Sequence, residues 1–165
     1  MGTSMLSEAD LKSIGQKYID DWVSKNSNDP LWVSLASPGD PINVPGITFG
    51  TQSQSVAGMH YPVHAQLIVL NRLMTAESKL CTFLHEYGHL LYAKSHCGEI
   101  DVVASEVEAI RFSLEALERE GYPDLCRREA IAVQQMATAE PYKSAVVILS
   151  QEPIWQRYTE LANPS

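Results

Sequence analysis

The sequence predicts an α+β fold in which a small β-sheet packs on a central helix and further helices follow toward the C-terminus. Candidate strands and proline-containing loops fall in the first half of the chain. From Thr75 onward Ala, Glu, Leu and Lys dominate, and no proline occurs before Pro123. Strands followed by helices are typical of the α+β class rather than of alternating βαβ units. The 165 residues are enough for one domain.

The first predicted element is a helix over about residues 7–25. Ser7 and Asp10 have the spacing of a capping box, in which each side chain bonds the backbone of the other residue. Apolar residues then recur every three or four positions, at Leu11, Ile14, Tyr18 and Trp22. This periodicity predicts a helix with one buried face.

A loop region and a few strands are expected next. Four prolines and two glycines between Asn26 and Gly50 predict mostly loop, with a short strand at Ile47–Phe49. The residues from Val56 to Leu70 have β-rich character, and Gln66–Leu70 is the strongest strand candidate. We expect a small antiparallel or mixed sheet here, with Val56–Tyr61 as its edge.

The second half of the chain is predicted to be helical. Two long helices are expected over about Thr75–Lys94 and Asp101–Glu120, with Gly98 as the break between them. Gly121 followed closely by Pro123 is a common helix stop. Further helices are predicted over residues 124–139 and 153–161.

The composition narrows the classes of function. The net charge is -8, and residues 85–165 hold 13 acids against 7 bases. Nucleic-acid binding relies on Lys and Arg to neutralise phosphates, so no direct nucleic-acid partner is expected. No apolar run or secretory signal is visible, which predicts a cytoplasmic protein without a membrane partner. The three cysteines, Cys81, Cys97 and Cys126, lack CxxC spacing and are predicted to be reduced.

One pentapeptide carries recognisable chemistry. Residues 85–89 read His-Glu-Tyr-Gly-His, an HExxH motif inside a predicted helix. Residues four apart lie on the same helical face, so His85 and His89 can bind one ion, with Glu86 on the adjacent edge. Catalytic zinc needs three protein ligands and an open position for water. A carboxylate beside that water can take its proton and pass it to a leaving amine.

The third ligand has to come from another segment. Four acids follow the motif, at Glu99, Asp101, Glu106 and Glu108. The first two fit a solvated helix start, which leaves Glu106 and Glu108. On a helical wheel Glu106 lies nearer the apolar stripe of its helix. The 18 residues between His89 and Glu108, however, give an HExxH-x18-E spacing that is similar to that of glutamate-ligand zinc peptidases. Periodicity alone leaves the choice open.

Three blocks of sequence occur in an order that is typical of one protein family. They are Leu67–Asn71, a strand ending in Asn; Cys81–Leu91, an HExGH helix; and Glu108–Leu117, which begins Glu-Ala-Ile-Arg-Phe-Ser. Together they resemble the ImmA/IrrE family of bacterial and phage metallopeptidases, whose third segment typically reads E-A-N-R-F-A. The resemblance covers roughly residues 58–118, and the sequence departs from the family pattern at Ile110, where Asn is common.

This resemblance implies a zincin-like fold and a ligand set. We expect a single zincin-like metallopeptidase domain over residues 1–165, with its catalytic core at about 46–120 and C-terminal helices at about 124–161. The resemblance makes His85, His89 and Glu108 the ligands of one Zn²⁺ ion and Glu86 the general base.

The resemblance also implies a function. We expect a zinc-dependent endopeptidase whose substrate is a regulatory protein, such as a helix-turn-helix repressor encoded nearby. His60, Tyr61 and His64 are candidates for oxyanion or substrate contacts, because they lie just before the strand leading to the motif. A peptide substrate could pair with the sheet edge at Val56–Tyr61. The alternative is a non-catalytic zinc-binding interaction protein, a toxin or regulator that acts by binding a partner. Glu86 favours catalysis, since a structural zinc site needs no base.

Overall fold

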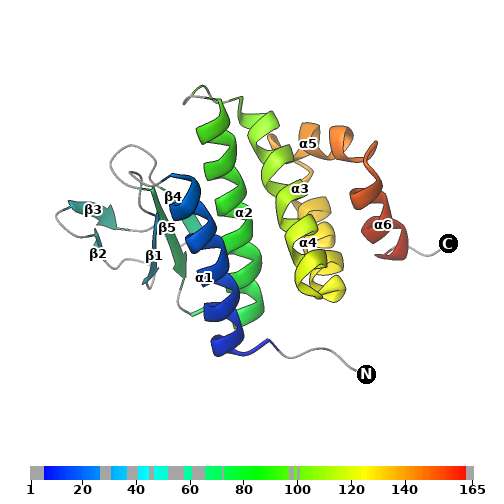
Figure 1. Cartoon of the computed structure of the whole chain (residues 1–165). Coiled ribbons are helices and arrows are strands. Elements are labelled where there is room, and N and C mark those ends of the chain that lie inside the picture. Colours follow the sequence, from blue (N-terminus) through cyan, green and yellow to red (C-terminus); the bar gives the residue numbers. More distant parts are fainter. Residues whose placement is uncertain are drawn as a thin grey trace. The chain divides into compact units, whose positions relative to one another are not determined.

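The computed structural model describes the following residues: 6–26, 31–36, 41–44, 47–51, 58–60, 66–71, 73–96, 99 and 101–162. Contacts within the chain define two compact units, Met5–Glu86 and a second composed mainly of Tyr87–Ser165. The boundary falls inside the helix that carries the HExxH motif, α2 (Ala76–Ser95). In the described residues, the strands come between α1 and α2 in the chain, and the other helices follow α2 (Figure 1). The single-domain organisation stays a prediction.

The first unit begins with helix α1 (Glu8–Lys25), as the periodicity predicted. The capping box is present, because the Asp10 N–H donates to Ser7 Oγ at 3.0 Å and the Ser7 N–H donates to Asp10 Oδ2 at 3.1 Å. The buried residues of this helix lie four apart, at Ile14, Tyr18 and Trp22. The sequence therefore specifies both the start and the buried face of α1.

The described strands form two small groups. β1 (Leu31–Ala36) pairs in parallel with β5 (Gln66–Asn71), and β4 (Gly58–His60) pairs with β5 in antiparallel orientation on the other side. β2 (Pro41–Val44) and β3 (Ile47–Thr51) form a separate antiparallel pair. β3 and β5 coincide with strand candidates, whereas β1 and β2 lie where loop was expected. Proline is compatible with the first residue of a strand, which is the position of Pro41 in β2.

Two side-chain caps connect β5 to α2. Asn71 Oδ1 accepts a hydrogen bond from the Leu73 N–H at 2.9 Å, so the last residue of β5 closes the turn. Thr75 Oγ1 accepts from the Ser78 N–H at 3.2 Å and caps the start of α2. These contacts fix where α2 begins.

The first part of α2 is held in the core of its unit. Leu80 and Leu84 are fully buried, and the Phe83 ring meets the Tyr18 ring edge-on with centroids 6.4 Å apart. Lys79 is also buried along its length, and its ammonium group lies 3.4 Å from a carboxylate oxygen of Glu8. The helix is therefore anchored one turn before the motif begins.

In its described residues, the second unit contains the end of α2 and four further helices (Figure 1). These are α3 (Val102–Glu120), α4 (Pro123–Met136), α5 (Tyr142–Leu149) and α6 (Pro153–Ala162). Gly121 ends α3 with φ at +94°, a backbone conformation that favours glycine, and Pro123 opens α4. The short helix α5 was not predicted; the other boundaries agree with the sequence to within a few residues. In the described part of the chain, no helix combines the length and apolar character needed to cross a membrane.

The close approach of α2 and α3 depends on Gly88. A Cβ atom added at Gly88 would lie 2.7 Å from the Cα atom of Ala109, which is backbone and cannot easily move. On the same side, the Tyr87 and Phe112 rings stack with centroids 5.4 Å apart. Gly88 of the HExGH motif is therefore needed for α3 to pack this closely against α2.

This packing makes a prediction about stability. Gly88→Ala is expected to lower the free energy of unfolding by about 1–3 kcal/mol, the usual cost of overpacking. Gly15→Ala is the matched control, because Gly15 lies in α1 and an added Cβ atom would meet nothing within 4 Å. That change is expected to raise stability by about 0.5–1 kcal/mol. Urea unfolding of the two variants measures both effects, and equal stability for Gly88→Ala and the wild type would contradict the proposed role of Gly88.

Candidate metal centre

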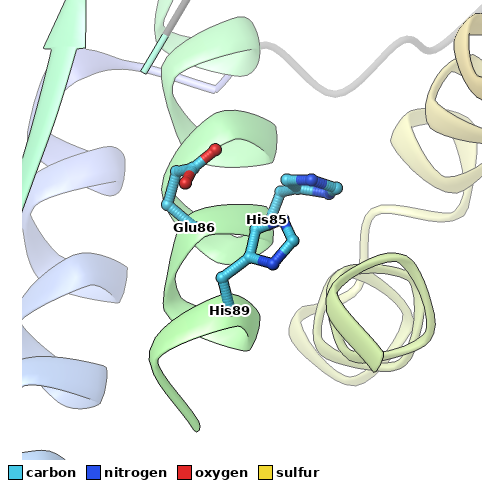
Figure 2. Close-up of side chains that lie close together, drawn as sticks. All are labelled: His85, Glu86 and His89. Atoms are coloured by element: carbon cyan, nitrogen blue, oxygen red, sulfur yellow. The ribbon is translucent and has the colours of Figure 1, made fainter. Parts of the chain in front are cut away.

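Three side chains that can bind a metal lie together on α2. His85, Glu86 and His89 each offer one ligand atom, and these atoms all lie within 4.8 Å of one another. Figure 2 shows both imidazoles extending from the same side of α2, with Glu86 on a neighbouring edge. His85 and Glu86 are half-buried, and His89 is buried. The structure thus brings together the three motif residues that the sequence singled out.

Both ring nitrogens of His89 have partners on α3. Nδ1 lies 2.6 Å from Ser105 Oγ, and Nε2 lies 3.1 Å from Glu106 Oε2. The side chains of His89 and Glu106 are only 11% and 13% exposed. Ser105 and Glu106 are consecutive residues in the first turns of α3, so one short segment holds both sides of the imidazole.

Glu108 lies elsewhere on α3. Its Oε1 atom is 2.5 Å from a guanidinium nitrogen of Arg111, and its side chain is 50% exposed. Arg111 in turn makes two hydrogen bonds to Glu152, at 2.6 and 2.5 Å. Hydrogen bonding to Glu152 raises the pKa of the Arg111 guanidinium above its usual range. These contacts tie Glu108 to a structural ion-pair cluster.

The two candidates for the third ligand have different neighbours, and the choice between them stays a prediction. Residues two apart on a helix point about 200° apart, so Glu106 and Glu108 cannot face the same neighbour. The structure places Glu106 beside His89 and places Glu108 beside Arg111. The contact of Glu106 with His89 agrees with the helical periodicity, which put Glu106 nearer the apolar stripe.

The donor atoms fit a zinc ion. Zinc in catalytic sites prefers imidazole nitrogens and a carboxylate oxygen at about 2.0–2.2 Å, which places two such ligands about 3.3 Å from each other. The 3.1 Å between His89 Nε2 and Glu106 Oε2 is close to that separation. Ser105 supplies the kind of hydrogen bond to the other ring nitrogen that metal-binding histidines usually have. On this chemistry the residues present suit a zinc site.

Three other candidates lie largely outside the described residues. His60 is the last residue of β4, and its backbone pairs with Ile68 of β5. β4 is at an edge of its three-stranded sheet as far as the described residues show, which is where a peptide substrate was expected to pair. Tyr61 and His64 lie outside the described residues. The role of His60, Tyr61 and His64 as oxyanion or substrate contacts stays a prediction.

The described cysteines are structural. Cys81 and Cys126 are buried, and neither forms a disulfide. Burial raises the pKa of the Cys126 thiol to about 11, and its Sγ atom donates a hydrogen bond to the Leu114 carbonyl at 3.4 Å. A thiol in that state is a poor nucleophile and a poor metal ligand. Cys97 lies outside the described residues.

Sequence reasoning missed Ser105. No motif or spacing marks a serine that precedes a candidate ligand, and its neighbour Asp101 carries the recognisable helix-capping pattern instead. Only the packing of α3 against the end of α2 shows that the hydroxyl meets His89.

An HExxH helix is the signature of the zincin class of metallopeptidase. Residues 44–120, just under half of the chain, match the family model described as the IrrE N-terminal-like domain, of peptidase family M78. This match confirms the resemblance to the ImmA/IrrE family of metallopeptidases that the three sequence blocks carry. No curated protein and no solved structure matches the chain.

Proposed function

We propose that this chain is a zinc-dependent endopeptidase that cleaves a regulatory protein in the cytoplasm. His85, His89 and Glu106 would hold one Zn²⁺ ion, and Glu86 would act as the general base. The observation that carries this proposal is the gathering of the His85, Glu86 and His89 ligand atoms within 4.8 Å of one another. The Glu106 carboxylate, 3.1 Å from His89 Nε2, is our candidate for the third ligand.

Each residue of the motif then has a defined task. Zinc, when bound, supplies a Lewis acid that polarises a peptide carbonyl and lowers the pKa of water to about 7. The Glu86 carboxylate accepts a proton from the attacking water and later donates it to the nitrogen that leaves as the peptide C–N bond breaks. Its half-buried position beside both imidazoles suits this role, since a base has to be near the ligands yet accessible to water.

The substrate class is supported by the family and by the charge. ImmA/IrrE resemblance favours a helix-turn-helix repressor encoded nearby as the protein cleaved. The net charge of -8 disfavours direct contact with nucleic acid, so an effect on transcription would act through such a protein. Among the described strands β4 lies at an edge, and it offers backbone groups with which an extended segment of that substrate could pair.

Metal removal tests this proposal. The purified chain is incubated with the helix-turn-helix protein encoded by the neighbouring gene, and cleavage is followed by gel electrophoresis and mass spectrometry. We expect cleavage that stops with a chelator and returns when zinc is restored. A chelator already saturated with zinc is the matched control and is expected to have no effect. Cleavage that persists after the metal is shown to be gone would refute a zinc-dependent mechanism.

A further inference from the structure

We infer that Ser105 is a positioning residue that holds His89 in the orientation needed to bind the metal. The inference rests on the proposed function, because it concerns the same zinc site. It adds a residue that lies outside the HExxH motif and acts through His89 rather than as a ligand.

The contact between Ser105 and His89 is short and shielded from water. The Oγ and Nδ1 atoms lie 2.6 Å apart, and the two residues are 4% and 9% exposed. A buried hydrogen bond without competing water holds a side chain more firmly than an exposed one does. Ser105 is itself fixed, since its N–H donates to the Asp101 carbonyl at 2.8 Å in a turn that the Asp101 side chain caps.

Ser105 and Glu106 together restrict rotation of the imidazole. The hydroxyl meets Nδ1 and the carboxylate meets Nε2, on opposite sides of the ring. Turning the ring away from the ligating orientation would break both contacts at once. Ser105 therefore lowers the conformational entropy that the His89 side chain loses when it binds a metal.

A hydroxyl also suits both protonation patterns of His89. If a metal were bound at Nε2, the ring proton would be on Nδ1 and would be donated to Ser105 Oγ. Without metal, a proton on Nε2 can be donated to Glu106, and Ser105 can then donate its own hydrogen to Nδ1. Serine can be donor or acceptor, so the ring keeps its orientation in both states. An acceptor-only group at this position could serve only the first state.

Zinc affinity tests the role of Ser105. Ser105→Ala is expected to weaken zinc binding about 10- to 100-fold, the usual effect of losing an outer-shell partner of a ligating histidine. Ser113→Ala is the matched control, because Ser113 is also buried on α3 but donates to the Ile110 carbonyl of its own helix. Zinc affinity of that variant should equal that of the wild type in a competition assay with a chromogenic chelator.

A second pair of variants separates hydrogen bonding from packing. Thr and Val have nearly the same shape, and only Thr keeps the hydroxyl, so Ser105→Thr should bind zinc at least 10-fold more tightly than Ser105→Val. This pair decides the question even if Ser105→Ala folds poorly. Nitrogen-15 NMR of the imidazoles in the zinc-loaded protein gives an independent readout. We expect the Nδ1 proton of His89 to be protected from exchange in the wild type and to exchange faster in Ser105→Ala and Ser105→Val.

The outcomes distinguish this inference from the proposed function. A wild-type chain that binds no zinc would refute the zinc site itself. Wild-type zinc binding together with equal affinities for Ser105→Thr and Ser105→Val, or an unchanged Nδ1 proton in Ser105→Val, would overturn the role of Ser105 and leave the zinc site standing.

Discussion

Glu86→Gln is expected to abolish peptide cleavage while leaving zinc bound. Glutamine has nearly the same size as glutamate but cannot accept a proton, so the variant lacks the general base and keeps the shape of the site. General-base catalysis typically contributes about 10²- to 10⁴-fold to the rate, and cleavage should fall by at least that range. The initial rate on the repressor substrate and the zinc content of the purified variant measure the two expectations.

Glu77→Gln is the control for Glu86→Gln. It makes the same chemical change on the same helix, in the first turn of α2 and more than two turns before Glu86. Cleavage by this variant should match that of the wild type. If Glu86→Gln cleaved as fast as Glu77→Gln with zinc present, the proposed mechanism would be wrong.

The same variant also separates catalysis from partner binding. A non-catalytic zinc-binding toxin or regulator would need the fold and the metal but not the base. Full biological activity of Glu86→Gln in cells, with zinc retained, would therefore support that alternative. Loss of activity in cells together with retained binding of the repressor would support the endopeptidase.

Local signals in the sequence were sufficient for most of the fold. The helices α1, α2 and α3 are defined by side-chain caps and by apolar residues three or four apart, and both signals depend on neighbouring residues only. β1 was not predicted, because its pairing partner β5 lies about 35 residues further along the chain and the prolines nearby suggested loop. Pairing between distant segments leaves little trace in a local sequence pattern.

The candidate site, like the fold, could be predicted from the sequence only where it depends on neighbouring residues. The two histidines of the HExxH motif are four residues apart and so lie on one face of a helix. The sequence alone could therefore place His85, Glu86 and His89 together. The third ligand depends on how α3 is rotated about its axis against α2. Periodicity carries part of that information, because buried positions face the neighbouring helix, but alone it left the choice between Glu106 and Glu108 open. The number of residues between motif and ligand does not carry it, since the connection between α2 and α3 absorbs differences in length.

Replacing Glu106 is expected to remove most of the zinc affinity, and replacing Glu108 is expected to leave it unchanged. Glu106→Gln takes away the carboxylate that lies 3.1 Å from His89 Nε2. Loss of a direct ligand should weaken zinc binding by more than loss of an outer-shell partner, which weakens it about 10- to 100-fold. Glu108→Gln removes only one side of a half-exposed ion pair with Arg111, which still pairs with Glu152. Its cost should be about 0–1 kcal/mol in stability.

The two glutamates form a matched pair for this test. They lie two residues apart on one helix, undergo the same substitution, and differ in the neighbour that each carboxylate meets. Zinc affinity by chelator competition and cleavage of the repressor should both fall for Glu106→Gln alone. Loss of zinc in Glu108→Gln with retention in Glu106→Gln would restore the ligand that the sequence spacing favoured. Such a result would mean that α3 turns about its axis when the metal binds, because Glu108 could not otherwise leave Arg111 and reach His89.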